Sequence, residues 1–478
     1  MISSSWQRTI ASAALIFAVF TGPTLASENA ANQGAATDER KKAEYDHAYT
    51  LGVQAVIYGW APVMMDVARV LQTSVDAPTD NGQAPVNELG PITRLWDHRD
   101  QSYATPNNDT LYLQGWADLE DEPMVLFVPE INDRYWMQQI LDMYTESVVD
   151  LTGATVGNGG EYYVLAKNGY DGAIPDGLTV YYSPTRYIWL AGRLGVSNTA
   201  DEAEAREIQK QFRLMPLSEY PDGGRQPEPG QADGAPTVAF PSGLDWFKRL
   251  DDVLAANPLP QDAPVTDQFS RIGIGADAIG VDDLSETQKT ALEAAFKDGF
   301  AIVSDAAKFS DTPVNGWNWE YDAGRYGTDF LQRSAVNMNS VGLNSPERAM
   351  YPKRFVDDQG EQLNGKNAYT ITLPANMPVR TEVGGFWSMT MYDDIDRFMV
   401  ENEINRYKVG TTTEGLVRND DGTLTVHIAH QRPNDPKQLA NWLPAPDGNF
   451  MLQIRLYEPL KEVVEGEFQL PQLYKILP

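Results

Sequence analysis

The residues with the clearest capacity for chemistry lie in the run PNNDTLY at residues 106–112. Four consecutive side chains of this run carry an oxygen that can bond a ligand or a metal: Asn107, Asn108, Asp109 and Thr110. A turn of these residue types beside a strand gathers several oxygens at one strand end, where a ligand can reach them. Such turns also bond their own backbone, so a purely structural turn is the alternative.

A second acid lies near the end of the run RYWMQQILDMY, which spans residues 134–144. We expect Asp109 and Asp142 to meet at neighbouring strand ends, where burial and mutual repulsion would raise one of the two pKa values toward neutrality. One carboxylate would then take a proton from water or substrate, while Arg134 stabilised the developing negative charge. The predicted catalytic residues are therefore Asp109, Asp142 and Arg134, although an ion pair between Arg134 and Asp109 could equally be structural.

Aromatic side chains are the second source of candidate ligand contacts. The chain contains 11 Trp and 22 Tyr, many of them near Asn, Asp or Gln. Flat aromatic faces bordered by oxygen-bearing side chains suit sugars and aromatic small molecules, whereas large β domains also bury Trp and Tyr in their cores and between subunits. The predicted ligand-binding residues are Asn107, Asn108, Tyr112, Trp136, Tyr144, Trp387, Arg406 and Tyr407.

Several other chemistries lack the residues they require. The chain has no cysteine, which excludes thiolate catalysis, thiolate zinc sites and disulfide bonds. It has no Gly-x-Ser-x-Gly elbow either. A spacing of three along a strand puts His427 and His430 on opposite faces, which disfavours a shared zinc ion. We predict no cofactor; the alternative is Ca²⁺ or Mg²⁺ held by the turn oxygens together with Asp142.

The first 26 residues have the pattern of a cleavable signal peptide. Arg8 precedes an apolar run from Ile10 to Phe20, and small residues then suit cleavage after Ala26. The apolar run is too short to span a bilayer easily, and an uncleaved anchor is the alternative. We therefore predict a periplasmic or secreted protein without a membrane-inserted segment, in which residues 27–37 form a flexible linker.

The charge of the chain narrows the expected partners. The formal net charge is -30, from 37 Lys and Arg against 67 Asp and Glu. Such a chain repels nucleic acid and anionic membrane surfaces, so neither is an expected partner. The expected partners are a small-molecule or sugar ligand and further copies of the same chain, in a homo-oligomer.

The elements that must position these residues are mostly short strands. In two separate parts of the chain, runs of β-branched and aromatic residues end at turn residues roughly every eight to twelve positions. A helical pattern separates them, and Ser285 with Gln288 matches a capping box at the start of a helix over about 286–309. We predict an α+β, β-rich fold with two antiparallel sandwich- or jelly-roll-like domains, a helical N-terminal segment and a helical middle section.

Several motifs of the chain resemble a bacterial family of unknown function. The first half has PNNDTLY at 106–112, WADL at 116–119 and RY at 134–135, and the second half has FWSMTMYD at 386–393, NWLPAP at 441–446 and RLYEP at 455–459. These motifs resemble two paired domains, of the domain-of-unknown-function families 1254 (N-terminal) and 1214 (C-terminal). The resemblance implies a β-rich two-domain architecture and no established reaction. We place an N-terminal domain at 38–220, a linker and helical section at 221–343, and a C-terminal β domain at 344–478.

Two functions from different classes fit this sequence. The first, which we favour, is an exported, cofactor-free enzyme of the hydrolase or lyase type, acting on a small molecule or sugar at an Asn/Asp/Arg pocket. The second is a non-catalytic, β-rich ligand-binding or assembly protein. A buried but water-accessible Asp109 beside Arg134 would favour the first function, and a fully bonded Asp109 without a nearby cavity would favour the second. An active C-terminal domain would instead use Asp393, Arg406 and Tyr407.

Overall fold

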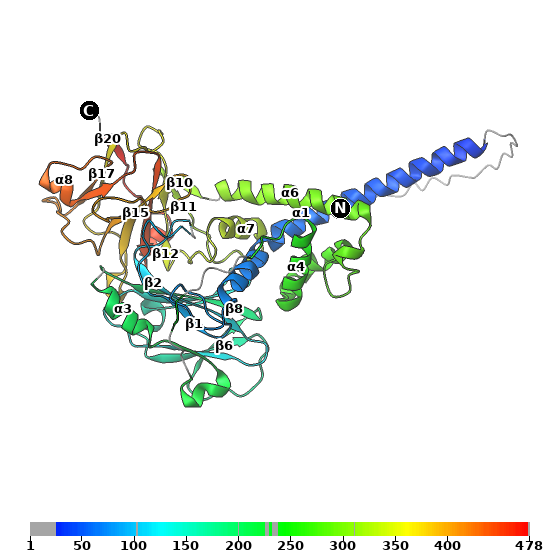
Figure 1. The fold of residues 1–478 in the computed structure, drawn as a ribbon, viewed down its shortest axis with the longest axis horizontal. Helices are drawn as coiled ribbons and strands as arrows, with labels where there is room; N and C mark the ends of the chain where they lie inside the picture. Colours follow the sequence, from blue (N-terminus) through cyan, green and yellow to red (C-terminus); the bar gives the residue numbers. More distant parts are fainter. Residues whose placement is uncertain are drawn as a thin grey trace, which may run out of the picture.

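The protein consists of two β domains and a group of helices that packs against them (Figure 1). The computed structural model describes residues 25–478 apart from 102–103, 199, 225–228, 232–237, 310 and 477–478, and it describes side chains from residue 36 onward. The signal peptide predicted at 1–26 therefore lies almost wholly outside the described residues.

Two sheets packed face to face make up the N-terminal domain. A five-stranded sheet has the order β1-β2-β8-β4-β5, and a four-stranded sheet has the order β7-β6-β3-β9. Alternate side chains of β2, β4 and β8 meet those of β3 and β6 in a shared core. The strands are β1 (Leu89–Ile92), β2 (Thr110–Asp118), β3 (Met124–Val128), β4 (Trp136–Asp142), β5 (Ser147–Thr152), β6 (Glu161–Lys167), β7 (Thr179–Ser183), β8 (Tyr187–Gly195) and β9 (Arg213–Pro216).

The C-terminal domain is a second pair of sheets around one buried core. One sheet has the order β10-β11-β13-β19-β15-β16, with β12 also paired to β19, and the other has the order β18-β17-β14-β20. Its first two strands, β10 and β11, lie within residues 221–343, the section predicted to be a linker and helices. The strands are β10 (Thr312–Val314), β11 (Trp317–Trp319), β12 (Ala349–Met350), β13 (Lys353–Arg354), β14 (Ala368–Leu373), β15 (Trp387–Asp393), β16 (Lys408–Gly410), β17 (Leu424–Ala429), β18 (Trp442–Pro444), β19 (Phe450–Tyr457) and β20 (Tyr474–Ile476).

The helices cover the outer face of the five-stranded sheet. Four of them, α1, α4, α6 and α7, pack on one another, and their core includes Trp116, Leu141 and Trp189 from the sheet. The layers are therefore four-stranded sheet, five-stranded sheet and helices. The helices are α1 (Leu25–Thr73), α2 (Gly153–Val156), α3 (Glu202–Gln209), α4 (Leu244–Ala256), α5 (Ala263–Thr266), α6 (Glu286–Phe309), α7 (Phe330–Asn339), α8 (Pro436–Ala440) and α9 (Lys461–Val464).

The capping box predicted at the start of α6 is confirmed. The backbone N–H of Gln288 donates to Ser285 Oγ at 3.2 Å, and the backbone N–H of Ser285 donates to Gln288 Oε1 at 3.1 Å. The wider prediction of an α+β, β-rich fold with antiparallel, sandwich-like sheets and helical N-terminal and middle sections is also confirmed.

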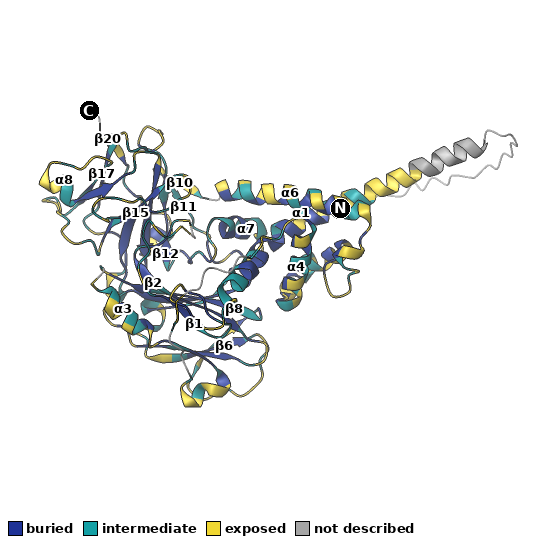
Figure 2. Ribbon diagram, viewed as in Figure 1, coloured by how far each residue is buried: buried dark blue, intermediate teal, exposed yellow. Residues whose placement is uncertain are grey.

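The first helix differs from its prediction. Residues 27–37 belong to α1 and do not form a flexible linker, which agrees with their high content of alanine, the strongest helix former. In Figure 2, α1 is mostly exposed over the first residues whose side chains are described and mostly buried from Leu51 to Val67. Its part Ala36–Thr73 is, among the described residues, long and apolar enough to cross a membrane, but 72% of its apolar window is buried inside the protein. Burial of this kind is typical of a core helix.

Candidate functional site

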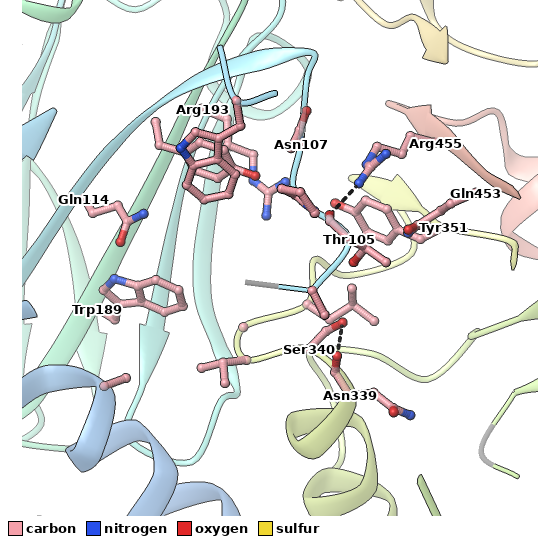
Figure 3. A pocket seen from close by; sticks show the side chains of 18 of the residues that line it. Thr105, Asn107, Gln114, Trp189, Arg193, Asn339, Ser340, Tyr351, Gln453 and Arg455 are labelled. Carbon is pink, nitrogen blue, oxygen red and sulfur yellow. Dashed lines mark hydrogen bonds between the residues drawn. The ribbon is translucent and has the colours of Figure 1, made fainter. Parts of the chain in front are cut away.

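A cavity of about 410 Å³ lies where the two β domains and the helices meet (Figure 3). Strands β2 and β8 form one wall, because alternate residues of a strand point to opposite faces and one set points away from the sandwich core. Segment 104–107 and strand β19 form another wall, and the end of α7 with the following loop completes the lining. The polar side chains of the two walls include Tyr112, Gln114 and Arg193 from the first and Asn107, Gln453 and Arg455 from the second.

Arg193 is the charged residue of the first wall. It is the one charged residue of the strand sequence YIWLAGRLG, and the register places it between Tyr112 of β2 and Met137 of β4. Its Cζ lies 5.1 Å from the centroid of the Tyr112 ring, and its buried Nε has no hydrogen-bond partner. No described residue forms an ion pair or a hydrogen bond with this guanidinium. Because a guanidinium stays protonated in proteins, its charge faces the cavity without a protein counter-charge.

Aromatic rings line the cavity beside Arg193. The rings of Trp96 and Tyr112 stack with centroids 5.2 Å apart, and Trp189 stacks on Trp116 at 5.8 Å. Gly342 packs against Trp189, where a Cβ would come within 2.4 Å of the indole ring, and its φ of +68° also favours glycine. The cavity therefore combines flat apolar faces with a cation.

Arg455, the second cation of the cavity, is bonded to uncharged groups. Its Nη2 donates to the carbonyl oxygen of Thr105 at 2.9 Å and to Tyr392 OH at 2.7 Å, and its Nη1 donates to Thr390 Oγ1 at 3.0 Å. Figure 3 shows Arg193 and Arg455 on opposite sides of the segment that carries Thr105. Among the described lining residues there is no aspartate or glutamate.

Asp109 lies behind the cavity, buried between the two domains. Its Oδ1 accepts a hydrogen bond from Lys408 Nζ at 2.7 Å, and its Oδ2 accepts from Ser388 Oγ at 2.6 Å and Tyr457 OH at 3.3 Å. Burial opposes ionisation, but the charges of Lys408 and Arg455 outweigh it and hold the pKa of Asp109 below its usual value. Asp109 is thus a bonded carboxylate with a cavity next to it. It therefore fits neither the water-accessible acid expected of an enzyme nor the acid without a nearby cavity expected of a binding or assembly protein.

The predicted acid pair is not assembled. Strand β8 lies between β2 and β4, and both neighbours run antiparallel to it. Asp109 aligns with Val196 beyond one end of β8, and Asp142 aligns with Ile188 near the other end. Eight residues of strand separate these positions by roughly 27 Å. The prediction that the two acids meet as a catalytic pair is therefore wrong.

Asp142 instead holds a turn. Its Oδ1 accepts from the backbone N–H groups of Tyr144 at 2.8 Å and Glu146 at 3.0 Å. Burial raises the pKa of Asp142 to about 7, and the negative charge of Glu146 adds to the rise. The rise toward neutrality thus occurs at one of the two predicted acids, but its cause is burial and not Asp109.

Arg134 does not lie beside Asp109 either. Its Nη1 donates to Asp201 Oδ1 at 2.9 Å, and its Nη2 pairs with Asp133 Oδ2 at 3.0 Å. Arg134 precedes β4 and extends toward α3, because the acids at the start of that helix attract it. The predicted ion pair with Asp109 is wrong, and the arginine of the cavity is Arg193.

The eight predicted ligand-binding residues separate into three groups. Asn107 and Tyr112 line the cavity described above. Asn108 and Tyr407 line a polar cavity of about 620 Å³, in which Tyr407 OH lies 2.7 Å from His98 Nδ1. The remaining four are held by packing or by main-chain hydrogen bonds: Trp136 and Trp387 in the two sandwich cores, Tyr144 through its OH to the carbonyl of Asn257, and Arg406 to the carbonyls of Ala440 and Trp442.

The oxygen ligands predicted for Ca²⁺ or Mg²⁺ are not brought together. Asp142 lies at the far end of the sheet from the turn, and both carboxylate oxygens of Asp109 already accept hydrogen bonds. No group of three or more His, Asp or Glu side chains that could hold a metal is found in the described part of the chain.

Reasoning from sequence missed the two arginines of the cavity. Arg193 and Arg455 each interrupt an otherwise apolar or uncharged strand, YIWLAGRLG and FMLQIRLY. A charge in a buried strand requires a polar environment on the face to which it points. A lone arginine in such a strand was therefore the available signal.

We predict that Asp109→Asn lowers the free energy of unfolding by about 3–5 kcal/mol, because it leaves the buried charge of Lys408 without its partner. Chemical denaturation measures the loss. Asp133→Asn is the matched control: this acid is 57% exposed, and Arg134 keeps its ion pair with Asp201, so the change should cost about 0–1 kcal/mol. A loss in Asp109→Asn no larger than in the control would show that the pair does not hold the domains together.

We predict that Asp142→Asn removes part of the pH dependence of stability. The pKa of Asp142 is about 7 in the folded chain, against about 3.9 in an unfolded chain. The folded state therefore binds more protons between these values, and wild-type stability falls as pH rises through this window. Asn keeps the Oδ1 acceptor and does not ionise. The free energy of unfolding of the variant, relative to that of the wild type, should therefore rise from pH 4 to pH 8. Urea denaturation at both pH values tests this, and a constant difference would contradict it.

Comparison with known proteins agrees with the two-domain architecture. The family model DUF1254, described as a protein of unknown function, matches residues 86–216, and DUF1214, with the same description, matches residues 348–461. No curated protein matches the chain.

One solved structure is similar in fold, and a second gives a weaker match. The crystal structure of the VPA0106 protein from Vibrio parahaemolyticus aligns with a TM-score of 0.68 and 25% sequence identity, over 90% of this chain and 100% of that one. The likeness to an uncharacterized protein from Burkholderia cenocepacia is weaker, with a TM-score of 0.41 and 13% identity over 92% of this chain and 97% of that one. The chain therefore belongs to the proteins of unknown function that pair an N-terminal DUF1254 domain with a C-terminal DUF1214 domain.

Proposed function

We propose that this protein binds a small organic anion with an apolar or aromatic body in the cavity between its two domains. The observation that carries the proposal is the guanidinium of Arg193, which lines the cavity and has no charged partner among the described residues. Carboxylate and phosphate groups bond a guanidinium through two parallel N–H···O hydrogen bonds. A bound anion would supply the partner that the protein itself does not.

The balance of charge at the junction supports an anion. Three cations lie at the junction, Arg193, Arg455 and Lys408, against one carboxylate, that of Asp109, which Lys408 and Arg455 approach. A buried charge without a counter-charge is costly, and an anionic ligand would offset the excess. An uncharged sugar, the other predicted ligand, would leave the excess in place. We therefore propose an acid and not a neutral sugar.

The shape of the cavity supports a small flat ligand. Its volume of about 410 Å³ falls within the range of roughly 300–1,000 Å³ for small-molecule sites. Trp96, Tyr112 and Trp189 offer aromatic faces, and Asn107 and Gln114 offer amide groups. This combination suits an aromatic or branched aliphatic carboxylate better than a small inorganic ion.

These residues support binding more than hydrolysis. A general base must lie within hydrogen-bond reach of the proton that it takes. The described lining residues include no Asp, Glu, His or Lys, and Asp109 is already bonded to Lys408 and Ser388. For this cavity we therefore propose the ligand-binding alternative over the hydrolase.

We predict that Arg193→Gln strongly weakens binding of organic acids. A thermal-shift screen of aromatic carboxylates, aliphatic carboxylates, sugars and divalent cations should give shifts with one or more acids. A bound ligand at a hundredfold excess over Kd stabilises the fold by about 2.7 kcal/mol. Loss of a hydrogen-bonded charge costs about 1.5–3 kcal/mol, which weakens binding roughly 10- to 150-fold.

The matched control is Arg325→Gln, which removes a side chain that is 64% exposed and does not line the cavity. It should keep the wild-type shifts. The proposal would be contradicted if acids gave thermal shifts as large in Arg193→Gln as in the wild type. Stabilisation by sugars alone would also contradict it.

We further propose that the protein functions after export. The support is the signal-peptide pattern of residues 1–26 and the absence of cysteine from a strongly acidic chain. N-terminal sequencing of the protein from a periplasmic fraction should begin at Ser27. Recovery of the full chain with Met1 from the cytoplasm alone would contradict export.

A further inference from the structure

Apart from the polar cavity at Asn108 and Tyr407, a smaller cavity of about 190 Å³ lies beside the interdomain cavity; these two are called the second and the first cavity below. Met338 and Asn339, at the end of α7, line both cavities. Lys353, Arg397 and Asp311 line the second cavity and not the first. The smaller cavity therefore has its own ionisable groups, and it is separated from the first by the end of one helix.

Register places Lys353 directly beside the first cavity. Lys353 of β13 is paired with Gln453 of β19 and with Asn318 of β11. Directly paired residues of antiparallel strands carry their side chains on the same face of the sheet. Gln453 lines the first cavity and Asn318 lines the second. Lys353 lies between these two residues in the same row across the sheet, on the face that lines both cavities.

The amine of Lys353 lies in surroundings that favour its neutral form. Its side chain is half-buried, and no described residue forms a hydrogen bond or an ion pair with it. Burial lowers the pKa of Lys353; the charges of Arg397 and Arg455 lower it further, whereas Asp311 and Glu320 act against the shift. A neutral lysine next to other cations is a stronger nucleophile than an ordinary surface lysine.

The neighbouring lysine of the same cavity differs. Lys308 is 62% exposed in its side chain, and its Nζ donates to Asp305 Oδ1 at 2.9 Å. The chain thus offers a reactive lysine and an ordinary one at a single cavity.

We propose that Lys353 is a nucleophilic amine that forms an imine with a small 2-oxo acid in the second cavity. The keto group supplies the carbon that the amine attacks. The carboxylate suits Arg397, whose guanidinium has no bonded partner among the described residues. The volume limits the compound to a few heavy atoms.

The proposed step balances without an oxidant or a reductant. The nitrogen lone pair of the neutral amine attacks the keto carbon, and the keto oxygen takes up a proton. The resulting carbinolamine loses water, which carries away both amine protons, so that C=O becomes C=N. Asp311 lines the same cavity and is the carboxylate placed to transfer these protons.

Reductive trapping tests this proposal on the whole protein. Incubation with pyruvate and sodium cyanoborohydride near pH 7 converts an imine into a stable secondary amine, which peptide mass mapping assigns to a lysine. A lowered pKa leaves more of the amine of Lys353 in its neutral, nucleophilic form, so the adduct on Lys353 should clearly exceed that on the exposed Lys308.

Variants separate this site from the anion cavity. Lys353→Met should abolish the adduct, and Lys308→Met should keep it. Arg193→Gln should also keep it, although organic acids should stabilise that variant much less than the wild type. Acetone, a ketone with a methyl group in place of the carboxylate of pyruvate, should label Lys353 less, because it lacks the group that Arg397 would bind. Two results on the wild-type protein alone would overturn the proposal. One is an even spread of adducts over the exposed lysines, and the other is the absence of an adduct on Lys353.

Discussion

A buried ion pair between the two domains is the interaction on which the site depends. The carboxylate of Asp109, on the N-terminal domain, accepts a hydrogen bond from Lys408 at the start of β16 in the C-terminal domain. Either charge alone would be buried without compensation, so the pair ties the segment before β2 to the sheet of the second domain. That segment is one wall of the larger cavity. Asp109, which the sequence predicted to be catalytic, therefore positions one wall of the cavity.

The distribution of charge is the second constraint. The chain as a whole is strongly acidic, yet three cations gather where the domains meet: Arg193, Arg455 and Lys408. Surface charges are screened over roughly 8 Å at physiological salt, whereas buried charges are screened much less. The acidic exterior thus does little to neutralise the interior. Repulsion by the acidic exterior disfavours the binding of large polyanions. The buried cations favour the binding of acids small enough to enter the cavity.

Much of the fold was predictable from local pattern, and the composition of the site was not. Strands such as Met124–Val128 and the capped start of α6 depend on nearby residues, and the structure has both. The placement of Asp109 and Asp142 depends on a strand distant in sequence, because β8 inserts between β2 and β4 and sets the two acids at opposite ends. Arg193 was overlooked for the same reason: its environment comes from Tyr112 and Tyr351, which pairing and domain contact bring near. Only the tertiary arrangement shows which arginine faces a cavity.

The central claim is that the charge of a small organic acid is what the interdomain cavity binds. Calorimetric titration of wild-type protein with the tightest-binding carboxylate, and with the corresponding uncharged amide, tests this claim most directly. The two compounds match closely in size and shape and differ in the group that would meet Arg193. A charged hydrogen bond is worth about 1.5–3 kcal/mol, so the acid should bind roughly tenfold tighter or more. Equal affinity for acid and amide would contradict the account.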